Sequence, residues 1–504
     1  MLQGEPHICI RHVDRLSPFL MSIVSDSDHW LFVGSNSAFT AGRVDSDHAL
    51  FPYQTVDKIL RYPDTGGSLS FFLVRTRDHW ALWEPWQASG SAYRIDRHLY
   101  KHIYGTSVVF EEINHDLGLR FCGSLGACEP YGFVRECRLE CLAGAGPVEV
   151  RYLDGWHQIL PTGVDQDTFG HFSYLAEAYM RHECPPQESL GIFTLNAAIT
   201  DRAEASELLR AACAWSIGHS HPVVLLSKRQ TKAFCRGESV QPEGEVRGEL
   251  GAYLVADTVT VTPDRPHHWF AVADTKLDHA ALVRLQNELK DPVTLERSLR
   301  QSLNANRSGL RLRIAAADGL QQTADQTTSI HHFANVLFNC MRGGTFSDSY
   351  RFPGADFAKF VRARNTAVHE RHHQWIGKLP ESLTLDQLHG EVAKQKDVHL
   401  SRLAHEYLPL GFSRRHGDPS RPWNRFNIHI KDEHGDPVYA YQGNWRDIFQ
   451  NWESLAQSYP AYLESMITAF LNASTADGYN PYRVTREGVD WEVANPRDRW
   501  SHIG

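Results

Sequence analysis

The chain has 504 residues, of which 42% are hydrophobic and 22% charged, and its formal net charge is -9 with 28 neutral histidines. This balance is typical of a soluble globular protein with roughly two to four domains. It argues against a nucleic-acid partner or an anionic membrane surface, because phosphate binding requires clustered Lys and Arg. The sequence has no apolar run of about 18 residues and no apolar signal segment near its start. We therefore expect a cytoplasmic protein without a membrane partner.

The nine cysteines are odd in number and widely scattered, which does not favour a disulfide framework. Cys137-x-x-x-Cys141, with Cys122 and Cys128 nearby, could suggest a zinc site. However, the spacing is irregular and these cysteines alternate with strand-like apolar positions. The pattern favours free buried thiols over metal ligands.

Up to about residue 270, short segments rich in β-branched and aromatic residues recur between Gly, Asp, Pro or Asn. The clearest are residues 30–33, 70–74, 79–83, 107–111, 117–121, 148–153 and 252–261. This pattern is typical of an antiparallel β-sandwich, and its length predicts two large sheets. Helices are expected within it at residues 172–182 and 202–215.

After His267-His268-Trp269 the periodicity becomes helical. Helices are predicted at residues 278–289, 294–303, 327–342, 357–375, 384–393, 398–407, 446–457 and 462–471. Such a series with short loops indicates an α/α array, which can be a bundle, a solenoid or a toroid of helical hairpins. No fixed-period repeat is present, which weakens the solenoid alternative.

The segment 439–455 has the sequence YAYQGNWRDIFQNWESL. On a helix that begins near Trp445, the predicted buried stripe consists of Ile448 or Phe449, Trp452 and Leu455. Arg446, Asp447 and Gln450 lie at the helix start, off that stripe or at its edge. Guanidinium, carboxylate and amide groups together can clamp sugar hydroxyls. The alternative is a capped helix whose Asp complements the N-terminal dipole and whose Arg forms a local salt bridge.

A second polar stretch, residues 472–491, interleaves aromatic and polar side chains without helical periodicity. Loops at helix ends commonly carry binding groups. Upstream, His369-Glu370-Arg371-His372-His373 matches H-E-x-x-H, which on a helix can present two zinc ligands and a general base. Helical rotation places His369 and His373 away from the apolar face, so zinc hydrolysis is a distant alternative, with Glu391 at a distance that a third ligand could occupy.

In the β region, Ala41-Gly42-Arg43 and Phe51-Pro52-Tyr53 are candidate loops for a domain interface or a ligand. Glu111 and Glu112 are adjacent carboxylates. Because neighbouring strand residues point to opposite faces, we do not expect these two to cooperate. The sequence has neither a G-x-S-x-G elbow nor a phosphate-binding P-loop.

These residues resemble the cellobiose- and chitobiose-phosphorylase group of glycoside phosphorylases and related bacterial proteins described as cellobiose phosphorylase-like. The group's helix-start pattern G-[FN]-x-R-D-x-x-Q-[DN] is matched by Gly443-Asn444-Trp445-Arg446-Asp447-Ile448-Phe449-Gln450-Asn451. Its following loop is matched by Asp477-Gly478-Tyr479-Asn480-Pro481-Tyr482. Residues 32–58 are similar to the opening of the β-sandwich in the related proteins.

The resemblance implies a multidomain β + α fold. It comprises an antiparallel β-sandwich of the supersandwich type at residues 1–268, a helical linker at 269–325, and the N-terminal part of an (α/α)6 toroid at 326–504. It also implies sugar binding through Arg446, Asp447 and Gln450, with Trp445 or Tyr482 stacking on the sugar. The expected partner is an oligosaccharide substrate, in a possible homodimer, with no cofactor or metal and with inorganic phosphate as a possible co-substrate.

Two departures from the group's pattern limit the implied activity. Asn451 stands where the phosphorylases usually have Asp. The group's general acid lies further along its chain, so the resemblance places that acid beyond Gly504 and predicts an incomplete toroid. The resemblance therefore leaves two hypotheses for the function. The chain is part of a glycoside phosphorylase or hydrolase, or it is a non-catalytic carbohydrate-binding or assembly module.

Overall fold

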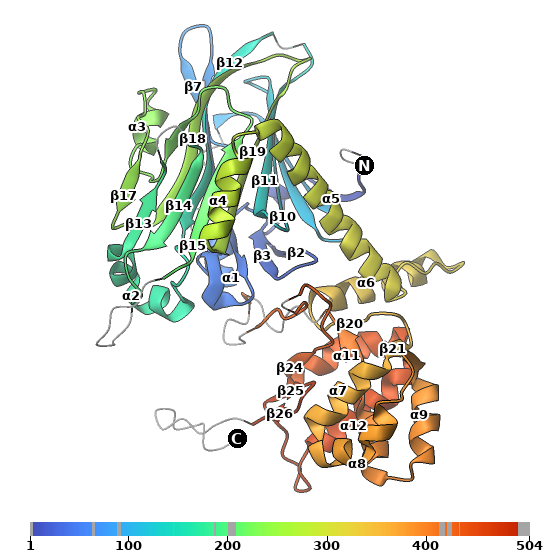
Figure 1. Cartoon of the computed structure of the whole chain (residues 1–504). Helices are drawn as coiled ribbons and strands as arrows, with labels where there is room; N and C mark the ends of the chain where they lie inside the picture. The colour runs from blue at the N-terminus through green and yellow to red at the C-terminus, as the bar shows by residue number, and fades with distance from the viewer. Residues whose placement is uncertain are drawn as a thin grey trace. The chain divides into compact units, whose positions relative to one another are not determined.

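The protein is described by a computed structural model (Figure 1). It describes residues 4–62, 66–87, 92–144, 146–185, 188–199, 208–412, 419–420, 426–432 and 434–491. The side chains of Arg446, Phe449 and Gln450 also lie outside the described part. The chain forms two compact units: residues 1–308 with 417–425, and residues 309–416 with 426–504.

The first unit is built on three antiparallel sheets. The ten-stranded sheet has the order β1 (His7–Arg11), β8 (Ile95–His102), β9 (Ser107–Asn114), β10 (Leu119–Cys128), β11 (Gly132–Cys141), β19 (His267–Leu277), β15 (Ala211–Ile217), β14 (Leu190–Leu195), β13 (Met180–Glu183) and β17 (Glu245–Arg247). The five-stranded sheet has the order β16 (Val223–Leu225), β18 (Gly251–Val261), β12 (Val148–Ile159), β6 (Gly67–Arg75) and β7 (Trp80–Trp83). The four-stranded sheet comprises β2 (Leu20–Val24), β3 (His29–Gly34), β4 (Phe39–Arg43) and β5 (Ala49–Phe51).

Apolar side chains from all three sheets meet in one core. It contains Leu31 of β3, Phe110 of β9 and Tyr253 of β18, all nearly inaccessible to solvent. A second cluster brings Phe72 of β6 against Phe121 of β10, with ring centroids 5.0 Å apart. Each sheet thus buries at least one face in these clusters, and strands such as β3 and β15 are buried along their whole length. The predicted N-terminal antiparallel β region is confirmed.

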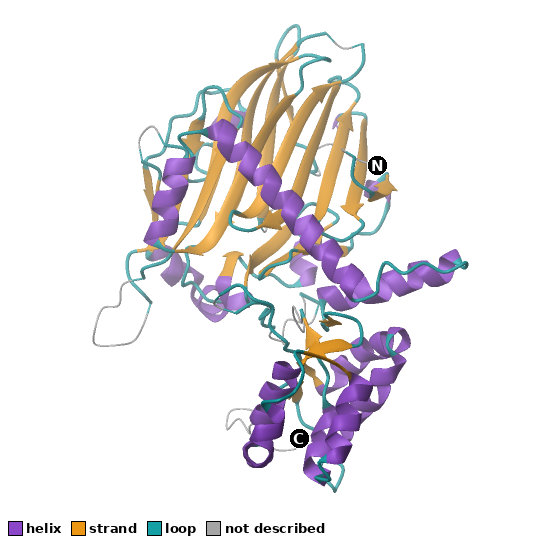
Figure 2. Cartoon of the chain, turned by 45° about the vertical axis from the view of Figure 1, so that its right-hand side comes forward, coloured by secondary structure: helices purple, strands orange, loops and turns teal. Residues whose placement is uncertain are grey.

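Helices cover parts of the β region (Figure 2). They are α1 (Val56–Arg61), α2 (Gln166–Ala178), α3 (Thr231–Cys235), α4 (His279–Glu288) and α5 (Pro292–Ala316), together with the short 3-10 turns Val13–Arg15 and Ser46–His48. Asp278 caps α4 by accepting a hydrogen bond from the Ala281 amide. Leu285 of α4 and Leu299 of α5 pack into the cluster that contains Phe270 of the ten-stranded sheet. This burial holds both helices on that sheet.

Several predicted elements differ from the structure. The helix expected at 172–182 ends with α2 at Ala178, and residues 180–182 belong to β13. The predicted linker starts at residue 269, but residues 267–277 form β19, which pairs with β11 on one side and β15 on the other. A strand buried on both edges and faces shows little alternation, so its pattern resembles that of a buried helix. The helix predicted at 202–215 is wrong where the chain is described, because residues 211–217 are β15; residues 202–207 lie outside the described residues.

The second unit is mainly helical. Beyond α5 it contains α6 (Gln326–Met341), α7 (Gly354–Arg364), α8 (Thr366–Ile376), α9 (Leu385–Lys394), α10 (Val398–Glu406), α11 (Trp445–Ser458), the turn Pro460–Tyr462 and α12 (Leu463–Ala473). Short strands pair between them: β20 (Thr345–Phe346) with β23 (Leu410–Gly411), and β21 (Arg351–Pro353) with β22 (Ser382–Thr384). In a third small sheet, β25 (Arg483–Thr485) pairs with β24 (Gln442–Asn444) on one side and β26 (Val489–Asp490) on the other.

The predicted helical character of residues 326–491 is confirmed, whereas a toroid of six hairpins stays a prediction. The single helix expected at 357–375 is two helices. Asn365 separates them with an extended φ of -158°, and its side-chain oxygen accepts a hydrogen bond from the Val368 amide. Asn is a strong N-cap residue and breaks the run despite apolar spacing that continues on both sides. Among the described residues, no helix is both long and apolar enough to span a membrane.

Candidate functional site

The predicted sugar-binding segment begins α11. Ile448, Trp452 and Leu455 are each at most 2% exposed and form the buried stripe of the helix, as expected. Gly443 precedes them, and a Cβ atom there would lie 2.9 Å from Ile448, so glycine permits the close approach of β24 to the helix. The apolar stripe and this glycine together fix the position of the start of α11 relative to β24.

The structure places three of the five predicted sugar contacts, Trp445, Asp447 and Tyr482. Trp445 is half-buried, and its ring meets that of Phe470 edge-on at 4.8 Å. Asp447 is buried, with 9% of its surface exposed, while Tyr482 is 41% exposed. The side chains of Arg446 and Gln450 lie outside the described residues. The aromatic ring of Tyr482 is therefore accessible, and the Asp447 carboxyl is sheltered at the helix start.

The helix start and the loop at 477–482 lie side by side. Strand β24 pairs with β25 in the register Gln442 to Thr485 and Asn444 to Arg483. One step further, the Trp445 amide donates a hydrogen bond of 2.9 Å to the Tyr482 carbonyl. Two stretches separated by more than 30 residues in the sequence thus form one edge. We call the paired segments 441–445 and 482–486 the paired edge.

The loop leading to the paired edge is ordered by its own polar groups. Gly478 has a φ of +91°, which favours glycine. The Thr475 amide donates to the Tyr479 carbonyl at 2.9 Å, and the Ser474 hydroxyl donates to the Asn480 side-chain oxygen at 2.9 Å. These bonds set the path of the chain into Tyr482.

Two buried ion pairs lie in the same unit. Arg486 and Asp356 are joined at 2.6 Å, and both are below 10% exposed. Arg364 pairs with Glu406, whose other oxygen accepts a hydrogen bond of 3.0 Å from Asn472. The local sequence does not reveal these charges as partners, because each looks like an ordinary helix-end or surface charge until the fold brings them together.

The H-E-x-x-H segment lies on α8 as predicted. His373 is exposed and its Nδ1 contacts the Glu370 carbonyl within the same helix at 2.8 Å. His372, which is not a ligand position of the motif, meets Asp397 at 2.9 Å, and this hydrogen bond is the main cause that lowers the pKa of Asp397 to about 2.

Glu391, the candidate third ligand, is paired with Lys394 at 2.6 Å. In the described part of the chain, His369 and His373 belong to no group of three possible ligands. The geometry therefore adds no support to the zinc hypothesis.

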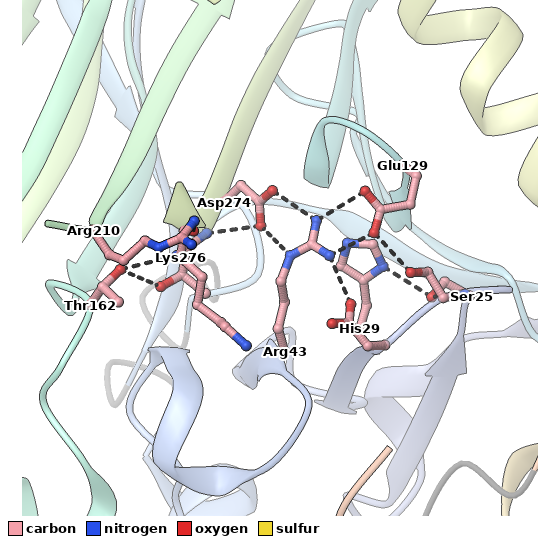
Figure 3. A network of polar contacts seen from close by, with 11 residues as sticks. Ser25, His29, Arg43, Glu129, Thr162, Arg210, Asp274 and Lys276 are labelled. Carbon is pink, nitrogen blue, oxygen red and sulfur yellow. Dashed lines mark hydrogen bonds and ion pairs between the residues drawn. The ribbon is translucent and has the colours of Figure 1, made fainter. Parts of the chain in front are cut away.

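In the first unit, Ala41-Gly42-Arg43 was predicted as a contact loop but is the end of strand β4. The buried Arg43 is the centre of a polar network (Figure 3), in which Asp274 is also buried and the Glu129 side chain is 42% exposed. The Arg43 guanidinium donates to both oxygens of Asp274 at 2.7 and 2.8 Å, and to Glu129 at 2.6 and 3.3 Å. A further bond of 2.7 Å reaches Asp28. Three carboxylates thus surround one guanidinium, which ties β4 to β19 of the ten-stranded sheet.

The pKa values in this network move in opposite directions. Burial by itself raises the pKa of Glu129, but the charges of Arg43 and His29 outweigh it and lower that pKa to about 2. For Asp274 burial prevails over Arg43, and its pKa is raised. Among the described residues, Asp28, His29 and Glu129 are the one group with metal-ligand spacing. However, the guanidinium already binds both oxygens of Glu129 and one oxygen of Asp28, and its positive charge beside them does not fit a cation.

Hollows adjoin both predicted contact loops of the β region. A cavity of about 290 Å³ lies beside the Arg43 network and is also lined by Arg210, Lys276 and Arg284. A second cavity, of about 470 Å³, is lined by Tyr53 of the Phe51-Pro52-Tyr53 element and by Phe169 of α2.

The adjacent carboxylates Glu111 and Glu112 have separate partners, as expected for residues on opposite faces of a strand. Glu111 accepts a hydrogen bond from the Tyr100 hydroxyl, and Glu112 accepts one from the Trp83 indole.

Residues 346–409 match the family model described as glycoside hydrolase family 149 insertion domain 1. This segment runs from β20 to three residues beyond the end of α10 and contains both Asp356 and Tyr407. None of the curated proteins compared with the chain matches it.

The chain is similar to a number of solved structures at low sequence identity, among them the following three. A bacterial glucoamylase complexed with acarbose shares 9% identity over 79% of this chain and 59% of its own, with a TM-score of 0.37. A human-microbiome protein provisionally described as a kojibiose phosphorylase shares 7% identity over 68% of this chain and 39% of its own, with a TM-score of 0.31. A Klebsiella pneumoniae protein provisionally described as an aldose 1-epimerase shares 7% identity over 57% of this chain and 91% of its own, with a TM-score of 0.26. At these TM-scores the similarities establish neither the family nor the function of the chain.

Proposed function

We propose that this chain is part of a carbohydrate-active enzyme of the glycoside phosphorylase or hydrolase type, acting on β-linked oligosaccharides. In this proposal the paired edge and the start of α11 bind the sugar. The hydrogen bond from the Trp445 amide to the Tyr482 carbonyl carries the proposal, because it brings together the two segments that resemble the phosphorylase motif. The match of residues 346–409 to a glycoside hydrolase insertion domain supports it independently.

The proposed roles follow from the chemistry of the groups. A sugar ring presents C–H groups on one face and hydroxyls at its rim. The exposed ring of Tyr482 can stack on that face. The carboxylate of Asp447 accepts hydrogen bonds from hydroxyls, while Arg446 and Gln450 donate to their oxygens. No metal or organic cofactor has a role in this proposal, and inorganic phosphate is the proposed co-substrate.

Replacing Arg446 with Ala is expected to weaken the binding of cellobiose to the 504-residue chain at least about tenfold, because a charged hydrogen-bond donor to the sugar is lost. Isothermal titration calorimetry measures the change directly. Arg362→Ala is the control, since Arg362 is an exposed arginine of α7 in the same unit. If wild type and Arg446→Ala bind cellobiose and laminaribiose with equal affinity, the assignment of Arg446 to sugar binding is wrong.

Binding and catalysis can be separated. Inverting phosphorolysis needs one protein acid, because phosphate replaces the water that a second carboxylate would activate. The proposal assigns that acid to none of these 504 residues. We therefore expect the chain by itself to bind cellobiose without releasing glucose 1-phosphate when phosphate is added. Release of glucose 1-phosphate by the purified chain would overturn this part of the proposal.

A further inference from the structure

A buried arginine secures one end of the paired edge. The Arg486 amide donates a hydrogen bond of 3.0 Å to the Tyr441 carbonyl, at the opposite end from the bond between Trp445 and Tyr482. The Arg486 side chain points away from the edge into the helical core, where only 5% of its surface is exposed. The position of Arg486 therefore determines where the chain leaves the paired edge after β25.

The partner of Arg486 lies in the first turn of α7. The Nη2 atom of Arg486 donates to the carboxylate of this partner, Asp356, at 2.6 Å and to the Asp356 carbonyl at 3.1 Å. The other carboxylate oxygen of Asp356 accepts a hydrogen bond of 2.6 Å from the Tyr407 hydroxyl. Tyr407 is fully buried, and burial raises its pKa, so that the phenol remains a donor. The guanidinium also lies 5.9 Å from the centre of the Phe360 ring.

These partners all belong to residues 346–409. Asp356 lies on α7 near the start of that segment, and its hydrogen-bond donor Tyr407 is the residue that follows α10 near its end. Around them Phe352, Phe357, Phe360 and Tyr407 form a tightly packed apolar cluster. The carboxylate is thus fixed in a rigid surrounding, while the arginine comes from the segment that carries the paired edge.

We infer that Asp356 and Arg486 are positioning residues for the sugar-binding edge, and that the segment 346–409 is the support against which this edge is aligned. The inference rests on the proposed function for the identity of the ligand. In this inference, the segment 346–409, which resembles an insertion domain, holds the Trp445–Tyr482 pair in register and does not contact the sugar.

The physical basis is the cost of an unpaired buried charge. If Arg486 is truncated, the Asp356 carboxylate keeps the Tyr407 hydroxyl but loses its counter-charge in a site that water does not reach. The chain can relieve this by moving residues 482–486 outward so that water enters. Such a shift breaks the bond at Tyr441 first and then loosens the one at Trp445. Misplacement of binding groups by about 1 Å can lower their effectiveness by up to about a hundredfold.

The experiment compares Arg486→Met, Arg486→Lys and Asp356→Ala in the 504-residue chain by hydrogen–deuterium exchange and by calorimetry with cellobiose. In Arg486→Met and Asp356→Ala we expect the Trp445 amide to exchange at least about tenfold faster, because its acceptor moves. Cellobiose affinity should fall at least about tenfold in both variants. Arg486→Lys keeps the charge beside Asp356 and should restore most of both properties.

The matched control is Asp397→Ala. Asp397 lies in the same segment, caps α10 and pairs with His372, but it does not contact the paired edge. It should destabilise the segment while leaving Trp445 exchange and cellobiose affinity unchanged. Equal effects of Asp397→Ala and Asp356→Ala, or unchanged Trp445 exchange in Arg486→Met, would overturn the inference. If the wild-type chain does not bind cellobiose or laminaribiose, the proposed function fails, whereas the exchange of the Trp445 amide still decides the positioning role.

Discussion

Replacing Arg43 with Met is expected to lower the free energy of unfolding of the β-sheet unit by about 3–5 kcal/mol, the range typical for breaking a buried ion pair. The guanidinium is the counter-charge for Asp274, which is 5% exposed, and for the carboxylates of Asp28 and Glu129. A methionine of similar length fills the space but leaves three carboxylates facing one another. Urea unfolding of the full chain, followed by the fluorescence of its tryptophans, measures the loss.

The control for this prediction is Arg94→Met. Arg94 pairs with Asp116 at 2.7 Å in the same unit, but its side chain is 77% exposed. An exposed pair of this kind contributes about 1 kcal/mol or less. If Arg43→Met and Arg94→Met shift the urea midpoint equally, the network around Arg43 does not tie the sheets together as its contacts indicate.

The β-sheet unit is also expected to lose stability in mild acid, and His157 should be a main cause. His157 is fully buried in β12, and neither of its ring nitrogens has a hydrogen-bond partner among the described residues. Burial, with a smaller contribution from Lys228, lowers its pKa to about 3. The unfolded chain binds the proton near pH 6.5 and the folded chain does not, so stability falls as the pH decreases below about 6.5.

Linkage gives the size of this effect. Between pH 7 and pH 5, a histidine with these two pKa values lowers the free energy of unfolding by about 2 kcal/mol. His219 and His267, whose pKa values burial lowers to about 4, act in the same direction. The variant His157→Leu removes one titrating group and should lose about 2 kcal/mol less than wild type over this range. Urea unfolding at the two pH values measures the difference.

His171→Leu is the control for the acid effect, since His171 is an exposed histidine of α2. Its replacement should leave the pH dependence of unfolding unchanged. A slope that is the same in wild type and in His157→Leu would mean that the buried imidazole accepts its proton without disturbing the fold, contrary to its lack of partners.

Local periodicity was sufficient to predict many of the individual elements. The apolar stripe Ile448, Trp452 and Leu455 recurs at helical spacing, and the structure buries all three. The strands predicted at 30–33 and 148–153 likewise occur as β3 and β12. The period of the apolar residues reports the buried face of α11 and of the start of β12 directly. Strand β3 is buried along its whole length, and its aromatic and β-branched residues, rather than alternation, indicate a strand.

The errors fall where local pattern and tertiary environment separate. Strand β15 is buried along its whole length and lacks alternation, so residues 211–215 were predicted as part of a helix. The break at Asn365 depends on a single capping side chain within an otherwise continuous apolar pattern. In both cases the deciding interaction lies outside the periodicity of the segment itself.

For the candidate site, the amino-acid sequence alone pointed to Trp445, Arg446, Asp447, Gln450 and Tyr482, because these residue types recur at the spacing of a known motif. Only the tertiary structure joined Trp445 to Tyr482 and brought Asp356, Tyr407 and Arg486 together. Likewise, Arg43 was visible as part of a short motif, but its three carboxylate partners were not. Periodicity records which face of an element is buried, whereas a pairing between distant charges leaves no trace in either segment and exists only once the chain has folded.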